Sequence, residues 1–188
     1  GIPFCILEKN ADVGGTWYEN TYPGARVDTP NYFYCYSFEP NHDWSQYYSA
    51  QPELQAYLKR CCDEYLVSEQ LQLNTTVTEV VFDEAEKFWR VHVQRQDGSN
   101  DVITAKSVIS AVGQLNHPKI PDFPGRGEFN GAQFHSAEYQ HEHDLRGKRV
   151  AVIGTGASAF QLVPAIVGQV AEIKVFQRSP VWMFPNPD

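Results

Sequence analysis

Apolar and polar positions near the C-terminal end follow a clear order of elements. RVAVIG, residues 149–154, has the branched apolar run of a buried strand, and EIKVFQ, residues 172–177, has the same character. Between them, residues 157–170 show the apolar spacing of a helix, which Pro164 is expected to kink. Strand, glycine-rich turn, helix and strand in this order predict a parallel βαβ unit.

The middle of the chain carries shorter runs that alternate between apolar and polar residues. Residues 71–83, 88–95 and 101–106 predict three strands of an antiparallel meander, with a turn at residues 97–100. SVISAVG, residues 107–113, is expected to form a buried strand that returns into a sheet. A proline-rich crossover, LNHPKIPDFPG, follows it.

The N-terminal part lacks such regular alternation. Residues 13–49 are rich in Gly, Pro and aromatic side chains, which predicts a long, ordered loop that covers a ligand and contains brief helical or strand pieces. Gln51 then opens a helix with Pro52 in its first turn, and apolar residues at helical spacing extend it to about Leu66.

Composition narrows the class of protein. The 188 residues are 42% hydrophobic with a net charge of −8, so the chain is globular and lacks the basic surface that nucleic acid or an anionic membrane requires. No apolar stretch approaches the roughly 20 residues of a membrane span, and the sequence shows no signal peptide. Cys5, Cys35, Cys61 and Cys62 have no metal-ligand spacing, which predicts reduced thiols, a cytoplasmic location and no metal site.

The glycine-rich turn before the predicted helix indicates a nucleotide site. Gly154 permits a tight turn, Gly156 lets the backbone approach a pyrophosphate, and Ala159 keeps helix and strand in close contact. Arg178 stands where an acid would bind a ribose 2′-hydroxyl, and its guanidinium suits a 2′-phosphate, so NADP is the expected cofactor. The alternatives are a doubly wound sheet without a ligand and a solvated Arg178. The residues expected to hold NADP are Gly154, Thr155, Gly156, Ala157, Ser158, Ala159, Gln161, Arg178 and Ser179.

A second nucleotide unit is indicated at the other end. Residues 1–10 read as its second strand, because Glu8 stands at the strand end where a carboxylate binds a ribose. Electron transfer from NADPH to a second nucleotide cofactor makes FAD the natural candidate. The sequence therefore predicts an α/β fold with two dinucleotide-binding, Rossmann-like and doubly wound domains, the first of which contains the antiparallel meander.

Both domains are expected to be incomplete. The first strand and glycine loop of the first domain would precede Gly1, and the second sheet is unfinished at Asp188, so we expect a fragment of a larger protein. The expected boundaries are residues 1–116 for the FAD-binding domain, 117–146 for a linker, and 147–188 for the start of the NADPH-binding domain.

Several longer motifs resemble those of one family. They are GGTWYENTYPGARVD (14–28), SAVGQLNHPKIP (110–121), FNGAQFHSAEY (129–139), VIGTGASA (152–159) and VFQRSP (175–180). Over essentially its whole length the chain resembles the class B flavin-dependent monooxygenases, and in particular the type I Baeyer–Villiger monooxygenases. NHDWSQYYSAQPELQAYL and DFPG are most similar to the aryl-ketone branch typified by hydroxyacetophenone monooxygenase.

The resemblance implies an enzyme that uses NADPH, FAD and O2 to insert one oxygen atom into a small-molecule ketone, giving an ester or lactone. By resemblance, Asp28 is the catalytic acidic residue beside the flavin, and it orients an arginine expected well beyond Val181. The resemblance places these residues at the FAD: Glu8, Gly14, Gly15, Thr16, Trp17, Tyr18, Glu19, Arg26, Asp28, Tyr34 and Val77.

These residues also have simpler interpretations. The two glycines fit a plain turn, and Trp17 and Tyr34 fit loop anchors without flavin contact. Asp28 follows Arg26 by two residues, so the two side chains could form an ion pair that stabilises the loop. A pyridine-nucleotide reductase would carry a redox CxxC pair, which this sequence lacks, and an NADP-binding module without catalysis is a further alternative.

The linker departs from the Baeyer–Villiger pattern. Phe129, Gly131 and His135 match its spacing, but Tyr139 and Gln140 stand where that pattern has Trp and then Pro or Asp. Tyr at this position is typical of the related N- and S-oxygenating flavin monooxygenases, which are the alternative function. Gly131 is expected to adopt a positive φ, and His135 to hydrogen-bond across the domain junction, as part of a hinge or in a chemical role.

Overall fold

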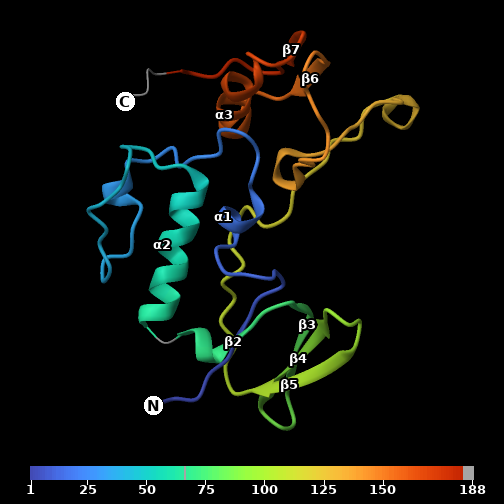
Figure 1. The fold of residues 1–188 in the computed structure, drawn as a ribbon. Helices are drawn as coiled ribbons and strands as arrows, with labels where there is room; N and C mark the ends of the chain where they lie inside the picture. The colour runs from blue at the N-terminus through green and yellow to red at the C-terminus, as the bar shows by residue number, and fades with distance from the viewer. Residues whose placement is uncertain (66, 184–188) are drawn as a thin grey trace. The chain divides into compact units, whose positions relative to one another are not determined.

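The computed structural model describes residues 1–65 and 67–183 (Figure 1). The chain divides into two compact units. The first unit joins Gly1–Gly15 to Leu58–Asn116, and the second joins Thr16–Tyr57 to His117–Asp188.

The first unit contains two small sheets. Strand β1 (Ile6–Leu7) pairs in parallel with β2 (Leu71–Gln72), which follows the 3-10 helix Val67–Gln70. The second sheet is antiparallel with the order β3 (Thr75–Asp83), β4 (Phe88–Arg95) and β5 (Asn100–Ala105) (Figure 1). The predicted meander is confirmed, except that Leu71–Gln72 pairs with the N-terminal strand instead of joining the meander.

Burial explains why the middle strand is fixed in register. Val91 and Val93 of β4 are both buried, as the alternation of a half-buried strand requires. Val91 pairs with Val80 and Ile103, and Val93 with Val77 and Asp101. A one-residue slip would turn both valines toward solvent, so this register is strongly specified.

The prediction of a buried strand at residues 107–113 is wrong. The structure describes this whole segment and assigns no strand to it. Ile109 is 90% exposed and Val112 is 67% exposed. A strand exists through backbone pairing with a neighbour, and no other described segment pairs with these residues.

Helix α2 (Gln51–Glu64) begins where the sequence predicts. Leu54, Tyr57 and Cys61 are buried, at spacings of three and four residues that place them on one helical face. The predicted end near Leu66 lies outside the described residues, and the described helix ends at Glu64.

Residues 16–49 of the long loop before α2 belong to the second unit and are ordered by polar contacts. They contain the predicted helical pieces, which are α1 (Thr16–Glu19) and a 3-10 helix at Asn31–Phe33. Asn31 is buried, and its side-chain Nδ2 donates to the Gln46 carbonyl at 2.6 Å. Its side-chain Oδ1 accepts from the Ser49 amide at 3.0 Å. One buried amide side chain therefore closes the loop on itself.

The predicted βαβ unit is confirmed. Strands β6 (Arg149–Ile153) and β7 (Glu172–Phe176) pair in parallel, and helix α3 (Ala157–Ile166) connects them (Figure 1). The helix ends at Ile166 rather than at residue 170, because a turn closed by the Gln169 amide on the Ile166 carbonyl follows at once. The kink at Pro164 stays a prediction.

The expected linker, residues 117–146, belongs to the second unit and holds short 3-10 helices at Arg126–Glu128 and Ser136–Glu138. Among the described residues, no helix has the length and apolar character that crossing a membrane would require.

Candidate functional site

The turn between β6 and α3 has the geometry of an open anion site. Gly154 adopts φ 112°, which favours glycine, and its amide donates to the Phe176 carbonyl at 2.9 Å. Among the described residues, nothing lies within 4 Å of a Cβ built at Gly154 or Gly156. Helix α3 then begins at Ala157, and no described side chain caps it. Free amides and the helix dipole therefore face open space, which fits a pyrophosphate.

Arg178 follows β7 and is exposed. It forms no ion pair with any described residue, so its guanidinium is available to an external anion. Ser179 is exposed beside it. Thr155 and Ala159 complete the turn and the first helical turn, where the Ala159 amide donates to the Gly156 carbonyl at 3.0 Å.

The segment Tyr22–Val27, which we call the docking segment, is fixed by its backbone on one side. The Val27 amide donates to the Ser49 carbonyl at 3.1 Å, and the Gln51 amide donates to the Ala25 carbonyl at 2.9 Å. Ala25 and Val27 are buried. The next residue, Asp28, is exposed at the end of this fixed segment.

The ion pair considered for Asp28 is not formed. Within the part of the chain that the structure describes, Asp28 and Arg26 make no salt bridge with each other. Arg26 instead contributes its backbone, which forms a bridge to Ala50. The Asp28 carboxylate is therefore free to face a cation from elsewhere.

Helix α3 holds the other side of the docking segment through one side chain. Gln161 Oε1 accepts from the Tyr22 hydroxyl at 2.8 Å and from the Arg26 amide at 3.2 Å. Gln161 Nε2 donates to the Arg26 carbonyl at 2.9 Å. The sequence predicts Gln161 as a cofactor ligand, whereas the structure places its amide against the protein's own backbone.

Gly24 makes this contact close, although it is not among the site residues predicted from the sequence. It adopts φ 82°, and a Cβ there would lie 2.5 Å from the Gln161 carbonyl oxygen and 3.0 Å from Ala165 Cβ. Any side chain would push the docking segment away from α3. The signal that could have found it is its place inside the TYPGAR motif.

The expected flavin contacts in the second unit lie in and around α1. The Trp17 indole donates to the Tyr34 hydroxyl at 3.1 Å, and the two rings meet edge to face with centroids 5.7 Å apart. The Gln51 side-chain amide donates to the Trp17 carbonyl. Thr16, Tyr18 and Glu19 belong to the same short helix and are half-buried. The structure thus brings Trp17 and Tyr34 together.

The other expected FAD residues lie in the first unit. Glu8 directly follows β1, and its Oε1 accepts from the Asn10 amide at 2.8 Å. Gly14 and Gly15 have φ 125° and 49°, so both use the left-handed region that favours glycine. Val77 is 40% exposed and precedes a bulge in the pairing of β3 with β4.

One expectation for the linker is wrong. Gly131, one of the described residues, does not adopt a positive φ. A Cβ there would lie 2.6 Å from the ring of the exposed Phe129, so this ring would have to move aside. His135 Nδ1 accepts from the Ala137 amide at 3.1 Å and caps the 3-10 helix Ser136–Glu138, and the hydrogen bond expected across the domain junction stays a prediction.

Tyr139 packs as a structural aromatic. Its ring meets Phe134 and His141 with centroids 5.1 Å and 4.8 Å away. Burial raises the pKa of the Tyr139 hydroxyl. His141 in turn hydrogen-bonds the Thr21 hydroxyl at 2.9 Å, which ties the linker to the residue before the docking segment.

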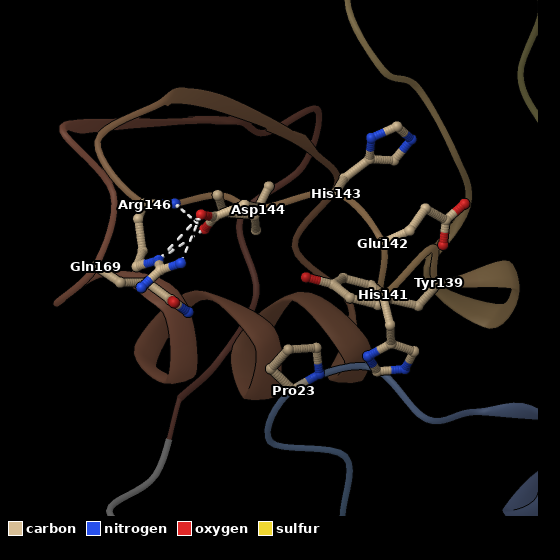
Figure 2. A pocket seen from close by; sticks show the side chains of 9 residues that line it. Pro23, Tyr139, His141, Glu142, His143, Asp144, Arg146 and Gln169 are labelled. Atoms are coloured by element: carbon tan, nitrogen blue, oxygen red, sulfur yellow. Dashed lines mark hydrogen bonds and ion pairs between the residues drawn. The ribbon is translucent and has the colours of Figure 1, made fainter.

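An open pocket of ≈ 350 Å³ lies beside these residues (Figure 2). Asp144 and Arg146 face each other there through several hydrogen bonds, and the guanidinium lowers the pKa of Asp144 to about 2. No group of three or more His, Cys, Asp or Glu side chains in the described ranges is arranged to hold a metal ion. The lining residues are Pro23, Tyr139, His141, Glu142, His143, Asp144, Leu145, Arg146 and Gln169.

A family model described as flavin-binding monooxygenase-like matches residues 2–186. The chain belongs to the flavin-binding monooxygenase-like family. It is 44% identical over 185 residues to a Baeyer-Villiger monooxygenase of Pseudomonas aeruginosa, covering 98% of this chain and 34% of that protein. A Baeyer-Villiger monooxygenase of Streptomyces coelicolor is 41% identical over 185 residues, covering 98% and 35%.

Solved structures of this family share the fold. The crystal structure of the OTEMO complex with FAD and NADP matches with a TM-score of 0.89 at 37% identity, over 98% of this chain and 36% of that chain. Oxidized steroid monooxygenase bound to NADP matches with a TM-score of 0.84 at 38% identity, again over 98% and 36%. The predicted α/β class with two dinucleotide-binding domains is confirmed. This flavin-binding monooxygenase-like chain spans roughly a third of the length of the relatives it matches.

Proposed function

We propose that the protein is a flavin-dependent monooxygenase that uses NADPH, FAD and O2 to convert a small-molecule ketone into an ester or lactone. The observation that carries the proposal is the placement of Asp28. Its carboxylate is exposed and unpaired among the described residues, yet the segment before it is held by Ser49, Gln51 and Gln161. Such a fixed, available charge suits a site that must be preorganised. Relatives named Baeyer-Villiger monooxygenases support the ketone as substrate.

The NADP end of the site would be built mainly from backbone. The uncapped start of α3 and the open turn at Gly154 and Gly156 would receive the pyrophosphate. Arg178 would bind the 2′-phosphate by charge-assisted hydrogen bonds. NADPH would supply a hydride. Structures of relatives with NADP support this assignment.

FAD would be held by a carboxylate, a glycine turn and an aromatic pair. Glu8 would bind a ribose hydroxyl, and the left-handed turn at Gly14 and Gly15 would let the backbone approach the cofactor. The Trp17–Tyr34 pair would present a rigid aromatic edge to the flavin end. FAD would supply the redox centre at which O2 is activated.

Asp28 would act on a neighbouring cation rather than on the substrate. A carboxylate fixed beside a positive side chain orients it and keeps it charged, and that charge then stabilises negative charge that develops on oxygen. The resemblance supplies an arginine as this partner. The domain boundaries at residues 1–116, 117–146 and 147–188 belong to the same proposal, as does a cytoplasmic location, which the four free cysteines support.

N- or S-oxygenation is the second candidate, and Tyr139 favours it. In the structure, however, the Tyr139 ring fills a space between Phe134 and His141. Another aromatic side chain such as Trp could fill that space in the same way. Tyr139 therefore does not distinguish the two reactions, and Asp28 favours a ketone as the proposed substrate.

The test is a product assay on the full-length protein with NADPH, O2, an aryl ketone and, in parallel, an aryl sulfide. The reaction balances as ketone, O2, NADPH and a proton giving ester, water and NADP+. We expect an ester that carries one labelled oxygen from ¹⁸O2. Sulfoxide without any ester would favour the second candidate, and NADPH binding without oxygenation of either compound would favour a module that binds NADP without catalysis.

A further inference from the structure

We infer that Gln161 is a positioning residue that couples nucleotide binding at helix α3 to the placement of Asp28. The inference rests on the proposed function, since it takes the start of α3 as the NADP site. Its basis is the set of contacts between Gln161 and the docking segment, Tyr22–Val27.

The Gln161 side chain is used in a way that no other polar group of similar shape could reproduce. Its carbonyl oxygen accepts from the Arg26 amide at 3.2 Å and from the Tyr22 hydroxyl at 2.8 Å. Its amide nitrogen donates to the Arg26 carbonyl at 2.9 Å. Arg26 is thus paired through both its backbone groups, as in a sheet, two residues before Asp28. A carboxylate lacks the donor, and an aliphatic side chain lacks both functions.

The same helix face receives the docking segment without any gap. A Cβ at Gly24 would lie 2.5 Å from the Gln161 backbone oxygen, so the segment is in direct contact with the helix backbone. Burial raises the pKa of the Tyr22 hydroxyl. A hydrogen bond to Ser158 lowers this pKa, and the negative charge of Asp28 raises it further. Ser158 lies in the first turn of α3. The Tyr22 hydroxyl therefore interacts both with the start of this helix and with the charge of Asp28.

These contacts connect the start of α3, where NADP is proposed to bind, to the docking segment that ends before Asp28. Gln161 lies about one turn along α3 from the glycine-rich turn, and a helix of 10 residues behaves as a rigid body over that length. Ordering the start of α3 by an anion would therefore also order the Gln161 side chain and the docking segment. Coupling of this kind is a free energy shared by two sites, typically worth about five- to 150-fold in an equilibrium constant.

Hydrogen–deuterium exchange at single residues tests the coupling in the full-length protein, with NADP+ as the probe. The Arg26 amide reports on the Gln161 bond, and the Val27 amide, which is bound to Ser49, reports on the loop. In the wild type we expect NADP+ to slow exchange both at residues 155–159 and at Arg26, the latter by about tenfold. In Gln161→Met, NADP+ should still slow exchange at residues 155–159, but its effect at Arg26 should fall below about twofold.

Gln169→Met is the matched control, because it makes the same replacement at an exposed glutamine after α3. It should preserve the effect of NADP+ at Arg26. Gly24→Ala gives an independent variant that separates the docking segment from α3 without altering the Gln161 side chain, and it should also abolish the effect at Arg26.

The outcomes are distinguishable. NADP+ protection at residues 155–159 without protection of Arg26 in the wild type would overturn the coupling while leaving the NADP site intact. Equal protection of Arg26 in the wild type and Gln161→Met would overturn the role of Gln161. Absence of protection at residues 155–159 in the wild type would overturn the NADP site itself, and with it the inference.

Discussion

Two aspartates of the second unit show how neighbours decide what a carboxylate can do. Asp144 accepts several hydrogen bonds from the Arg146 guanidinium. This guanidinium lowers the pKa of Asp144 to about 2, and the two side chains form a local ion pair. Asp28 is exposed and has no such partner in the described part of the chain. At the scale of single residues, Asp28 is therefore the carboxylate that can serve a partner from elsewhere.

Arg178→Ala is expected to weaken NADPH binding by roughly 1.5–3 kcal/mol, because it removes a charge-assisted contact with the 2′-phosphate. NADH lacks that phosphate, so its affinity should change little. Dissociation constants of the full-length protein for both nucleotides give the measurement. Lys174→Ala is the control, since that cation of β7 is already paired with Glu172 at 3.3 Å. Equal losses for NADPH and NADH would rule out the assignment of Arg178.

At the scale of elements, a loop and a helix form the candidate site together. Backbone bonds to Ser49 and Gln51 fix one side of the docking segment, and Gln161 of α3 fixes the other. Asn31 closes the rest of the loop through Gln46 and Ser49. A loop without regular structure thus acquires the rigidity that a preorganised charge needs.

Asn31→Ala is expected to lower the free energy of unfolding by about 1–3 kcal/mol, because it leaves the buried Ser49 amide and its neighbours without partners. Urea denaturation of the variant and the wild type gives the measurement. Asn130→Ala, at an exposed position, should leave the urea midpoint unchanged. A midpoint for Asn31→Ala equal to that of the wild type would show that the loop is held by something else.

At the scale of the whole molecule, what the sequence predicts well is what local spacing determines. The strand, glycine turn, helix and strand around Gly154 are read from adjacent residues, and α2 from its apolar period. The strand predicted at residues 107–113 is not found, because a strand depends on pairing with a segment that can be far away in sequence. The positive φ expected of Gly131 is not found, because glycine permits that conformation without requiring it.

The role of Gln161 could not have been read from the sequence for the same reason. Its partners Tyr22 and Arg26 lie 139 and 135 residues away, and no period or motif encodes that contact. Family motifs identified the residues around it, and the structure then showed which of them touch each other.

Replacement of Asp28 by alanine in the full-length protein tests the central claim most directly. Ester formation from an aryl ketone should fall by roughly 10²–10³-fold, as for loss of a preorganised charge contact, while flavin reduction by NADPH should fall far less. Asp43→Ala, which removes an exposed aspartate from the same long loop, should leave both rates unchanged. Ester formation by Asp28→Ala at the wild-type rate would contradict the account.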